Sequence, residues 1–297
     1  MPARPPLPVI VNAAGGTARR MKSGLADQIE GAFAAARRAI ELELVDGDGL
    51  RAALQRHAGA PRIAVGGGDG TLGTAAATVS QHHGELAILP LGTRNHFAGQ
   101  LGIPSDLAGA AALAAGGKTR AVDLGQAADR TFVNNLSAGA YVDLVREREA
   151  SRLPKLLATI PASWRTLRNL RSRPFDLTVD GRRVGVATPL LFIGNNRYEV
   201  AEGRPVERAA MDDGVLAIYA VAPLSRASLI AAALRTLAGR ARMHRDFAID
   251  CTAREVRIVG PGTTLDVAID GERCSFDLPV TVRILPRALA VVAPESN

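Results

Sequence analysis

The stretch from Gly66 to Thr71, GGGDGT, constrains the fold of this chain more than any other. It follows the apolar run 63–65 and precedes a helix-like segment over 72–79, so the sequence predicts a strand, a tight turn and a helix in succession. Glycines have no Cβ, so a ligand can approach the backbone closely and successive N–H groups can point at an anion. The helix start adds its positive dipole end and unpaired amides. We interpret the stretch as a phosphate cradle that carries one carboxylate, Asp69; a glycine-rich turn without a ligand is the plainer alternative.

A regular alternation of strand-like and helix-like segments fills the chain up to about residue 125. Short apolar strands are predicted at 9–12, 41–45, 63–65, 86–90 and 119–124, and helical patterns at 29–40, 50–57, 72–80 and 107–115. This order is typical of a doubly wound, largely parallel sheet, whose ligands bind at the carboxyl ends of the strands. Three loops of small residues, at 12–16, at 66–71 and from Leu91 onward, follow such strands. We therefore expect these loops to meet at one cleft.

Beyond about residue 125 the pattern changes to segments of period two separated by Asp-Gly turns. Strands are predicted at 175–179, 183–186, 189–193, 215–221, 247–251, 255–259, 265–269, 273–276, 280–285 and 289–292, with one helix over 224–241. Alternation of this kind predicts a second, antiparallel β domain. We therefore predict an α/β nucleotide-binding domain over 1–125 and a β domain over 126–285.

The net charge indicates which partners are favoured. The chain has 36 Lys and Arg against 29 Asp and Glu, a formal net charge of +7 that favours nucleotide phosphates, nucleic acid or an acidic membrane surface. With one Trp, three Tyr and no recognition motif, nucleic acid ranks below a lipid surface. Two cysteines are too few for a disulfide framework, and no signal peptide or bilayer-spanning apolar run is found. A cytoplasmic protein is expected.

The segment from Pro90 to Ala98, PLGTRNHFA, contains a second set of candidate nucleotide contacts. Gly92 and Thr93 offer an amide and a hydroxyl, and Asn95 offers a neutral donor and acceptor; such groups orient a nucleotide without repelling its charge. The same residue types also form ordinary turns. The loop by itself leaves both interpretations open.

Taken together, these motifs resemble those of a known family. GGGDGT at 66–71, PLGTRNHFA at 90–98 and IDGE at 269–272 resemble the diacylglycerol kinase catalytic-domain family, which includes bacterial lipid kinases and sphingosine kinases and has the NAD kinases as more distant relatives. Lesser similarities lie at Asn12 with Gly15-Gly16, at 134–139 and at Asp212-Asp213-Gly214. The similarity runs from Val9 to about Val292.

The resemblance implies a fold, a reaction and its cofactors. The fold is an NAD kinase- and diacylglycerol kinase-like α/β domain followed by an antiparallel β-sandwich, with ATP in the cleft between them and the final strand, over 286–297, returning to the first domain. The reaction is transfer of the γ-phosphoryl group of ATP, with Mg²⁺, to a hydroxyl of diacylglycerol or a related lipid. The implied ATP-binding positions are Asn12, Gly66, Gly67, Gly68, Asp69, Gly70, Thr71, Gly92, Thr93 and Asn95.

Two positions depart from the family's pattern. Where relatives usually have an acidic residue after the asparagine of the second motif, this chain has His96. In bacterial relatives that acid belongs to a network which, with the positions matching Asp69 and Asp123, supports a structural Mg²⁺, and a neutral imidazole is a poor ligand for this hard cation. Asp69 and Asp123 are the predicted metal residues, with the arrangement around the metal left open. The turn after Asn12 lacks the family's proline and serine, which removes one hydroxyl from phosphate binding.

Phosphoryl transfer needs a carboxylate near the attacking hydroxyl, and two aspartates are candidates. In some relatives the position matching Asp270 is taken as the base, whereas in others the aspartate of the glycine-rich motif, here Asp69, has that role. Asp270-Gly271 also fits a hairpin turn, as Asp180-Gly181 does. Because Glu272 follows directly and the motif order matches the family, we predict Asp270 as the base. Glu272 is the predicted second carboxylate for metal or ATP, and Asp69 belongs to the phosphate and metal network.

A basic stretch between Arg146 and Arg173 suggests a contact with membranes. It holds eight basic residues against two acidic ones, and its apolar residues recur at helical spacings. This combination suits an interfacial helix on an anionic membrane, although a helix packed on the β domain explains the leucines equally well. The residues assigned to the membrane surface are Trp164, Arg165, Arg168 and Arg171.

The sequence therefore predicts an ATP-dependent lipid kinase that associates peripherally with the inner face of the membrane. One alternative is a kinase of a soluble acceptor such as NAD. The other is a non-catalytic nucleotide- or lipid-binding protein, which His96 and the altered turn at Asn12 suggest. The expected partners are ATP and a lipid at an anionic membrane surface, without nucleic acid; a homodimer is left open.

Overall fold

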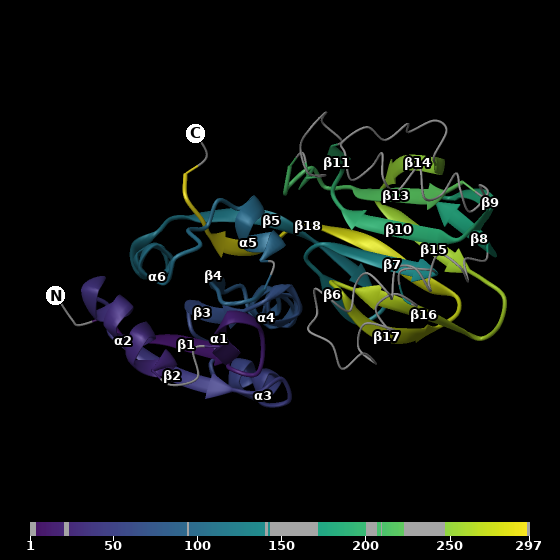
Figure 1. Ribbon diagram of the computed structural model, residues 1–297. Helices are drawn as coiled ribbons and strands as arrows, with labels where there is room; N and C mark the ends of the chain where they lie inside the picture. Colours follow the sequence, from purple (N-terminus) through teal and green to yellow (C-terminus); the bar gives the residue numbers. More distant parts are fainter. Residues whose placement is uncertain are drawn as a thin grey trace. The chain divides into compact units, whose positions relative to one another are not determined.

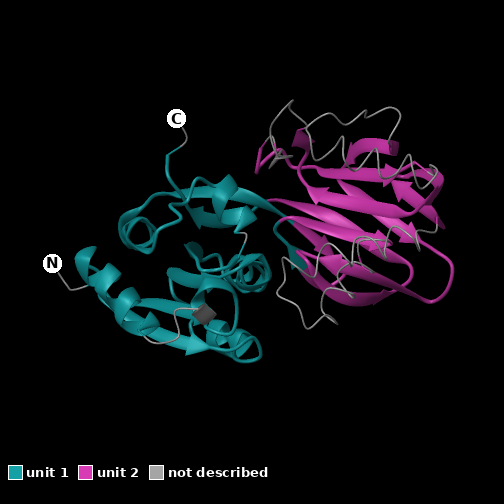
Figure 2. Ribbon diagram, viewed as in Figure 1, with its two compact units in different colours: residues 1–124, 131–133, 287–297 teal, residues 125–130, 134–286 magenta. Residues whose placement is uncertain are grey.

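The computed structural model describes residues 4–20, 24–93, 95–139, 142, 172–199, 207–208, 210–222 and 247–295. The chain divides into two compact units (Figure 2). Unit 1 comprises residues 1–124, 131–133 and 287–297, and unit 2 comprises residues 125–130 and 134–286. The predicted helix over 224–241 lies outside the described residues, and so does nearly all of the basic stretch.

Unit 1 is built on a parallel sheet with the strand order β2-β1-β3-β4 (Figure 1). Its strands are β1 (Leu7–Asn12), β2 (Ile40–Val45), β3 (Arg62–Gly67) and β4 (Glu85–Pro90). Its helices are α1 (Gly16–Arg20), α2 (Leu25–Ala35), α3 (Gly49–Arg56), α4 (Asp69–Gln81), α5 (His96–Gln100) and α6 (Leu107–Gly116). The order confirms the predicted doubly wound α/β fold, because β1 pairs with both β2 and β3 and the chain reverses its direction of travel there.

The core of unit 1 comes from apolar runs in the strands and from one face of each long helix. Val9, Ile10 and Val11 in β1 are fully buried, as are Ile29 and Phe33 in α2. The predicted extension of this helix to residue 40 was wrong. Helix α2 ends at Ala35, Arg37 adopts a left-handed conformation (φ 54°), and the apolar alternation that follows forms β2 instead.

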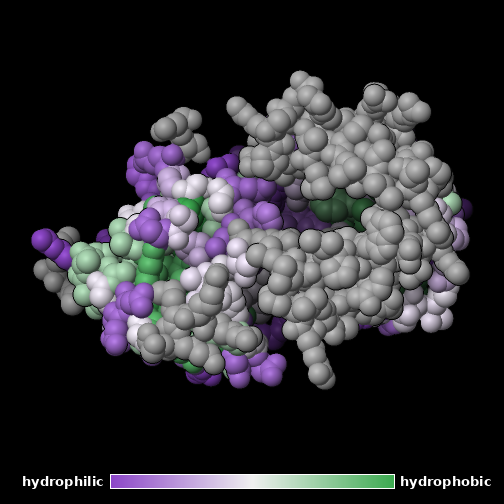
Figure 3. Space-filling model, viewed as in Figure 1, coloured by the Kyte–Doolittle hydropathy of each residue, from purple (hydrophilic) through white to green (hydrophobic). Residues whose placement is uncertain are grey.

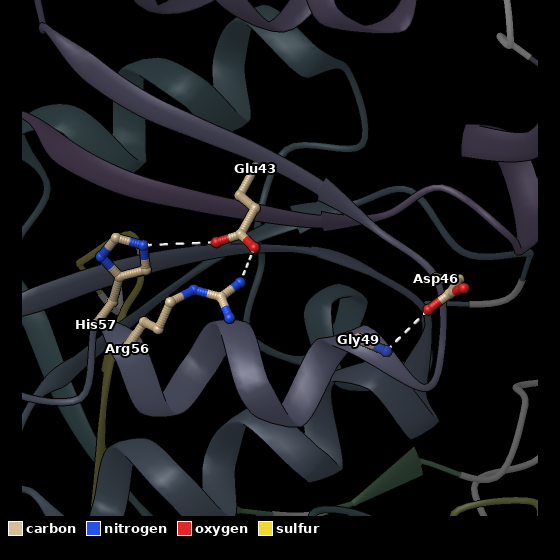
Figure 4. A network of polar contacts seen from close by, with 5 residues as sticks. All are labelled: Glu43, Asp46, Gly49, Arg56 and His57. Atoms are coloured by element: carbon tan, nitrogen blue, oxygen red, sulfur yellow. Dashed lines mark hydrogen bonds and ion pairs between the residues drawn. The ribbon is translucent and has the colours of Figure 1, made fainter.

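Helix α3 contacts strand β2 at its C-terminus and the residue that follows β2 at its N-terminus (Figure 4). At its C-terminus, Arg56 forms an ion pair with Glu43 of β2, and His57 Nε2 lies 3.6 Å from the other carboxylate oxygen of Glu43. At its N-terminus, the Asp46 carboxylate accepts a hydrogen bond from the Gly49 N–H at 2.8 Å. These contacts hold the βα unit that precedes the glycine-rich motif.

Strand β18 (Val280–Val292) belongs to both units. Its first part pairs antiparallel with β15, and its end pairs parallel with β4, where Ala290 lies opposite Glu85. The sequence predicted two strands separated at Pro286, but the strand is continuous. At the irregular point Arg287 has φ 51° and donates its N–H to the buried Asp123 carboxylate at 2.7 Å, so a side chain satisfies that amide. Strand β5 (Thr119–Ala127), which carries Asp123, also pairs with β18 and with β6 (Arg130–Phe132).

The described residues of unit 2 form two larger antiparallel arrays of strands and one short strand pair. The first has six strands in the order β14-β13-β10-β7-β16-β17. They are β7 (Asn135–Gly139), β10 (Leu190–Asn195), β13 (Leu216–Val221), β14 (Phe247–Ala253), β16 (Thr264–Ile269) and β17 (Glu272–Asp277). The second joins the start of β18 to β15 (Glu255–Val259), β8 (Arg173–Val179) and β9 (Arg182–Thr188).

Alternation along the strands of unit 2 produces the predicted β core. Leu191 and Ile193 of β10 and Val256 and Ile258 of β15 are all fully buried, and they alternate with residues that are more exposed or lie on the other face. A short pair, β11 (Tyr198–Glu199) and β12 (Glu207–Arg208), follows β10. The antiparallel β domain is thereby confirmed.

The surface of the described segments is of ordinary character. Hydrophobic and hydrophilic residues are mixed over the face of unit 1 that Figure 3 shows. Among the residues that the structure describes, the large hydrophobic side chains that are exposed are Leu44 and Val259. No helix in these segments is long and apolar enough to cross a membrane.

Candidate active site

Three loops of unit 1 lie at the carboxyl edge of its parallel sheet. They follow β1 at Asn12, β3 at Gly67 and β4 at Pro90, and the three strands are hydrogen-bonded neighbours. The predicted convergence of the loops is visible in their direct contacts. Thr17 donates its N–H to Leu91 O at 2.9 Å and its hydroxyl to Gly92 O at 3.2 Å, which ties the first loop to the third.

Glycines allow these loops to touch. A Cβ on Gly92 would lie 2.4 Å from the Cα of Gly68, which is closer than any real contact. Gly16 has φ 57°, and a Cβ there would lie 2.7 Å from the carbonyl oxygen of Leu91. A Cβ on Gly68, by contrast, would meet only the Cα of Gly92, at 3.4 Å. Gly16 and Gly92 are therefore required by loop packing, whereas Gly68 leaves open space beside the start of α4.

Gly66, Gly67 and Thr71 of the first motif pack inward. A Cβ on Gly67 would collide with the Thr71 side chain at 2.6 Å, and one on Gly66 would collide with Val11 at 2.9 Å. Thr71 is 8% exposed, and its hydroxyl accepts a hydrogen bond from Asn12 Nδ2 at 3.1 Å. Asn12 also accepts the Ala14 N–H through Oδ1. Asn12 and Thr71, both predicted to bind ATP, here fasten β1 to α4.

The N-terminus of helix α4 follows directly on the glycines of the first motif. Its N-cap is Gly68, in an extended conformation (φ −96°, ψ −176°), and no side chain caps the helix. Among the described residues, no side chain accepts a hydrogen bond from the first amides of this 13-residue helix, where the positive end of its dipole lies. A phosphate group would supply the acceptor that these amides lack.

Asp69 does not cap its own helix but the short helix α5. Its Oδ1 accepts the Phe97 N–H at 3.0 Å, and its Oδ2 accepts the His96 N–H at 3.3 Å. The carboxylate thus joins the glycine-rich motif to the loop after β4. The His96 side chain is exposed. Sequence patterns did not predict α5, because a helix of five residues carries no periodic signal.

Asn95 closes its own loop. It adopts the left-handed conformation (φ 52°), its Oδ1 accepts the Gly92 N–H at 2.9 Å, and its Nδ2 donates to Pro90 O at 2.9 Å and to Gly92 O at 3.3 Å. These bonds use the side-chain amide on the turn, which favours the turn interpretation for this residue. Thr93 is exposed at the tip of the loop, and Gly70 lies in the first turn of α4.

The predicted metal residues do not make up a metal site by themselves. Both oxygens of Asp69 accept backbone amides, and Oδ1 of the buried Asp123 accepts the Arg287 N–H. Within the described ranges, no group of three or more His, Cys, Asp or Glu side chains could hold a metal ion. Among the described residues, the side chains around Asp69 and Asp123 do not by themselves make up the Mg²⁺ site that the resemblance implies.

The predicted base lies in unit 2, at the hairpin between β16 and β17. Asp270 and Gly271 both have positive φ (48° and 86°), the geometry of a tight Asp-Gly turn. Asp270 Oδ1 accepts the N–H groups of Asn134 (2.8 Å) and Asn135 (3.1 Å), and the Asp270 N–H donates to Asn135 O at 3.0 Å. The carboxylate is therefore held against the start of β7. Glu272, the first residue of β17, is exposed.

A buried polar cluster behind this turn was not predicted. Asn134, Asn195 and Arg208 are 9%, 1% and 8% exposed. Arg208 donates to Asn134 Oδ1 at 3.1 Å and to Asn195 O at 3.4 Å. Tyr198 donates its hydroxyl to Asn134 O at 3.3 Å, and burial raises the pKa of the neighbouring Tyr219 phenol. Arg208 belongs to no recognised motif, and it contributes to this cluster from β12, which is far from Asn134 in the sequence.

The residues assigned to the membrane surface, Trp164, Arg165, Arg168 and Arg171, lie outside the described residues. Their assignment stays a prediction.

Comparison with known proteins identifies the family. The diacylglycerol kinase catalytic domain model matches residues 6–127, and the YegS C-terminal NAD kinase beta sandwich-like domain model matches residues 135–293. Diacylglycerol kinases of Staphylococcus aureus strains JH9 and Newman are 26% identical over 250 residues, which is 82% of this chain and 78% of theirs. Among solved structures, a diacylglycerol kinase from Bacillus anthracis str. Sterne is similar over 97% of both chains, with a TM-score of 0.70 and 21% identity. A candidate diacylglycerol kinase from the same strain is similar over the same share, with a TM-score of 0.75 and 23% identity. The chain belongs to the diacylglycerol kinase catalytic-domain family.

Proposed function

We propose that this protein is an ATP-dependent lipid kinase that transfers the γ-phosphoryl group of ATP to the hydroxyl of diacylglycerol or a related lipid. The observation that carries the proposal is the uncapped N-terminus of α4 behind the glycines of the family's first motif. Membership of a kinase family indicates the class of reaction, and the amides at the helix N-terminus offer a binding site for phosphate. MgATP is the proposed donor, with the metal carried by the nucleotide.

On the nucleotide side, unit 1 would bind and orient the phosphates. The amides at the start of α4 would donate to them, and Gly68 would let them approach the backbone. Four side chains would act by holding the three loops in register, because their hydrogen bonds run between or within these loops; they are Asn12, Thr71, Asp69 and Asn95. Such positioning lowers the barrier of phosphoryl transfer, since the reaction needs alignment and charge stabilisation more than covalent help.

On the acceptor side, Asp270 would take the proton of the attacking hydroxyl. The acceptor oxygen forms a bond to the γ-phosphorus while the bond from that phosphorus to the bridging oxygen of ADP breaks, and ADP leaves. The proton passes to the Asp270 carboxylate, which two backbone amides hold in place. Glu272, two residues further on, would provide a second carboxylate for the metal-bound nucleotide.

A lipid is the proposed acceptor because the curated relatives are named diacylglycerol kinases. We test the class of acceptor by incubating the protein with γ-labelled ATP, Mg²⁺ and a total lipid extract, followed by partition between organic and aqueous phases. Label in an organic-phase product supports the proposal, and diacylglycerol added alone should give the same product. Label found only in water-soluble product would overturn it.

The second candidate is a kinase of a soluble acceptor such as NAD. One observation favours it: the model that matches 135–293 describes an NAD kinase beta sandwich-like domain. Adding NAD to the same assay separates the two, because phosphorylated NAD stays in the aqueous phase.

The cradle assignment has its own test. Gly68→Val adds a side chain whose Cβ meets only the Gly92 Cα at 3.4 Å, so we expect a folded protein with nucleotide binding abolished. Gly59→Val is the matched control, because a Cβ there has no atom within 4 Å and the residue precedes the amino end of β3. ATP binding is measured with a fluorescent nucleotide. If Gly68→Val binds ATP with wild-type affinity, the nucleotide does not bind at this turn.

Peripheral membrane association is part of the proposal and rests on the basic stretch. Each basic residue near an anionic surface contributes at most about 1 kcal/mol, and salt screens it. Changing Arg165, Arg168 and Arg171 together to Gln should weaken sedimentation with anionic vesicles and spare activity in neutral detergent. Equal vesicle binding by the triple variant would exclude these arginines from the interface.

A further inference from the structure

The Asp270 carboxylate is held by the backbone at Asn134 and Asn135, and Asn134 itself accepts three hydrogen bonds. The N–H of Asn134 donates to the Asp270 carboxylate at 2.8 Å. The carbonyl oxygen of Asn134 accepts the Asn195 N–H at 2.8 Å and the Tyr198 hydroxyl at 3.3 Å. Its side-chain Oδ1 accepts Arg208 Nη2 at 3.1 Å. The Asn135 N–H, which belongs to the same peptide as the Asn134 carbonyl, also donates to the Asp270 carboxylate at 3.1 Å. The backbone that holds the carboxylate thus has little freedom to move while these partners stay in place.

Arg208 links the two segments that hold Asn134. Its Nη2 bonds to the Asn134 side chain, and its Nη1 lies 3.4 Å from Asn195 O, in the residue whose N–H donates to Asn134 O. The guanidinium therefore closes a ring of hydrogen bonds through residues 134 and 195. Its planar fork, with several donors at fixed angles, suits such a bridge, whereas a lysine offers a single point charge.

Burying this guanidinium is costly, which argues that its place in unit 2 is specific. Arg208 is 8% exposed, and removing a charged group from water is unfavourable unless hydrogen bonds compensate. The turn Asp180-Gly181 shows that, among the described residues, an aspartate in such a turn can accept two backbone amides without a buried arginine nearby. Asp180 also accepts two consecutive amides, from Arg254 and Glu255, and all three residues are exposed.

We propose that Arg208 is a positioning residue for phosphoryl transfer: through Asn134 it fixes the backbone amides that orient the Asp270 carboxylate. This inference rests on the proposed function, because it takes Asp270 as the base. Arg208 itself touches neither nucleotide nor acceptor in this scheme. Its removal should therefore lower kcat and leave the KM for ATP unchanged, since the nucleotide cradle lies in unit 1.

Two measurements on Arg208→Met test the proposal. Hydrogen exchange of a peptide covering 133–137 reports on the amides that grip Asp270, and we expect faster exchange at Asn134 and Asn135 than in the wild type. In the lipid assay we expect kcat to fall by roughly ten- to a hundredfold, the range that a misplaced catalytic group causes. Arg208→Lys keeps the charge without the fork and should fall between wild type and Arg208→Met. It also serves if Arg208→Met fails to fold.

A double-mutant cycle separates positioning from general loss of stability. If Arg208 acts through Asp270, its substitution should have little further effect on kcat in an Asp270→Asn background. A merely structural role would lower activity by the same factor in both backgrounds, and that result would overturn the proposal. Unchanged exchange at 134–135, or unchanged kcat with faster exchange, would also overturn it. A wild-type protein without lipid kinase activity would remove the proposed function instead, and the exchange data would then decide whether Arg208 holds the Asp270 turn.

Discussion

Two Asp-Gly turns of unit 2 have nearly the same backbone and differ in what surrounds them. Asp180-Gly181 joins β8 to β9 with φ values of 44° and 84°, and Asp270-Gly271 joins β16 to β17 with 48° and 86°. In each, the aspartate carboxylate accepts the N–H groups of two consecutive residues on another segment. The local device is the same, so the turn alone does not mark a site.

The difference lies behind the turns. Asp180 accepts the amides of Arg254 and Glu255, and all three residues are exposed. Asp270 is half-buried and accepts the amide of Asn134, which belongs to the buried polar cluster with Arg208. Buried polar networks are costly unless every member is satisfied, and they fix geometry when they are. The same kind of turn is therefore a candidate catalytic element only at Asp270, where a buried polar cluster holds the residue to which the aspartate is bonded.

The largest expected effect is a loss of turnover in Asp270→Asn that Asp180→Asn does not show. Asp270→Asn keeps the shape of the turn but removes the proton acceptor, and a positioned general base contributes on the order of 10² to 10⁴ in rate. We expect kcat to fall by that amount with ATP affinity unchanged. Asp180→Asn is the matched control, because it weakens an equivalent pair of hydrogen bonds and should leave kcat at the wild-type value. Lipid phosphorylation under saturating ATP measures both.

Two outcomes would break the comparison. Equal loss of kcat in Asp180→Asn and Asp270→Asn would mean that both turns act on activity through the stability of unit 2. Near-wild-type turnover in Asp270→Asn would mean that Asp270 is not the base, and Asp69 would then be the remaining candidate.

A third aspartate repeats the pattern in unit 1. Asp69 accepts the amides of His96 and Phe97, so it shares the two-amide grip and holds the α5 loop. Asp69→Asn keeps one acceptor oxygen and turns an NH₂ group toward the other amide. Because a hydrogen bond to a charged group contributes about 1.5–3 kcal/mol, MgATP affinity should fall on the order of tenfold, together with turnover. Fluorescent nucleotide titration and the lipid assay measure the two.

The result for Asp69→Asn discriminates between positioning and base catalysis. Positioning moves affinity and kcat together. A variant that binds MgATP as tightly as the wild type but has no turnover would instead make Asp69 the base, with Asp270 as the structural turn.

Sequence patterns predicted the fold class and the convergence of the loops, because these follow from local periodicity. Strand alternation placed the carboxyl ends of β1, β3 and β4 at one edge, and the glycines of the first motif marked the close approach. The end of α2 at Ala35 was missed, because the helical spacing of Ile29 and Phe33 continues to positions 37 and 40 while the backbone turns at Arg37.

The roles of individual side chains were less predictable, because they depend on contacts between distant segments. Asn95 and Thr71 match positions implied to bind ATP, yet the side chain of Asn95 bonds within its own loop and that of Thr71 bonds to Asn12. Arg208 reaches Asn134 across 74 positions of the chain, and no local pattern encodes such a partner. Local sequence therefore predicts where a site forms more readily than which residue supports it.

The smallest expected effect concerns the glycines of the two turns. Gly181→Ala and Gly271→Ala each force a Cβ onto a residue with φ near 85°, and at neither position does the new atom meet another atom within 4 Å. Only the backbone strain counts, about 1–2 kcal/mol for an L-residue in this region. We expect both variants to lower the melting temperature of the protein by the same few degrees.

Activity should then distinguish the two alanine variants. Gly271 adjoins Asp270, whose carboxylate is anchored on two amides, so strain in the turn should shift it slightly and reduce kcat by a small factor, well below that of Asp270→Asn. Gly181→Ala should leave kcat unchanged at a temperature where both variants are folded. If the two melting temperatures fall unequally, the turns are not equivalent in energy, and the turn with the larger fall depends more on its glycine. If they fall equally while only Gly271→Ala loses turnover, the two turns share their structural role, and the catalytic role belongs to the surroundings of Asp270 alone.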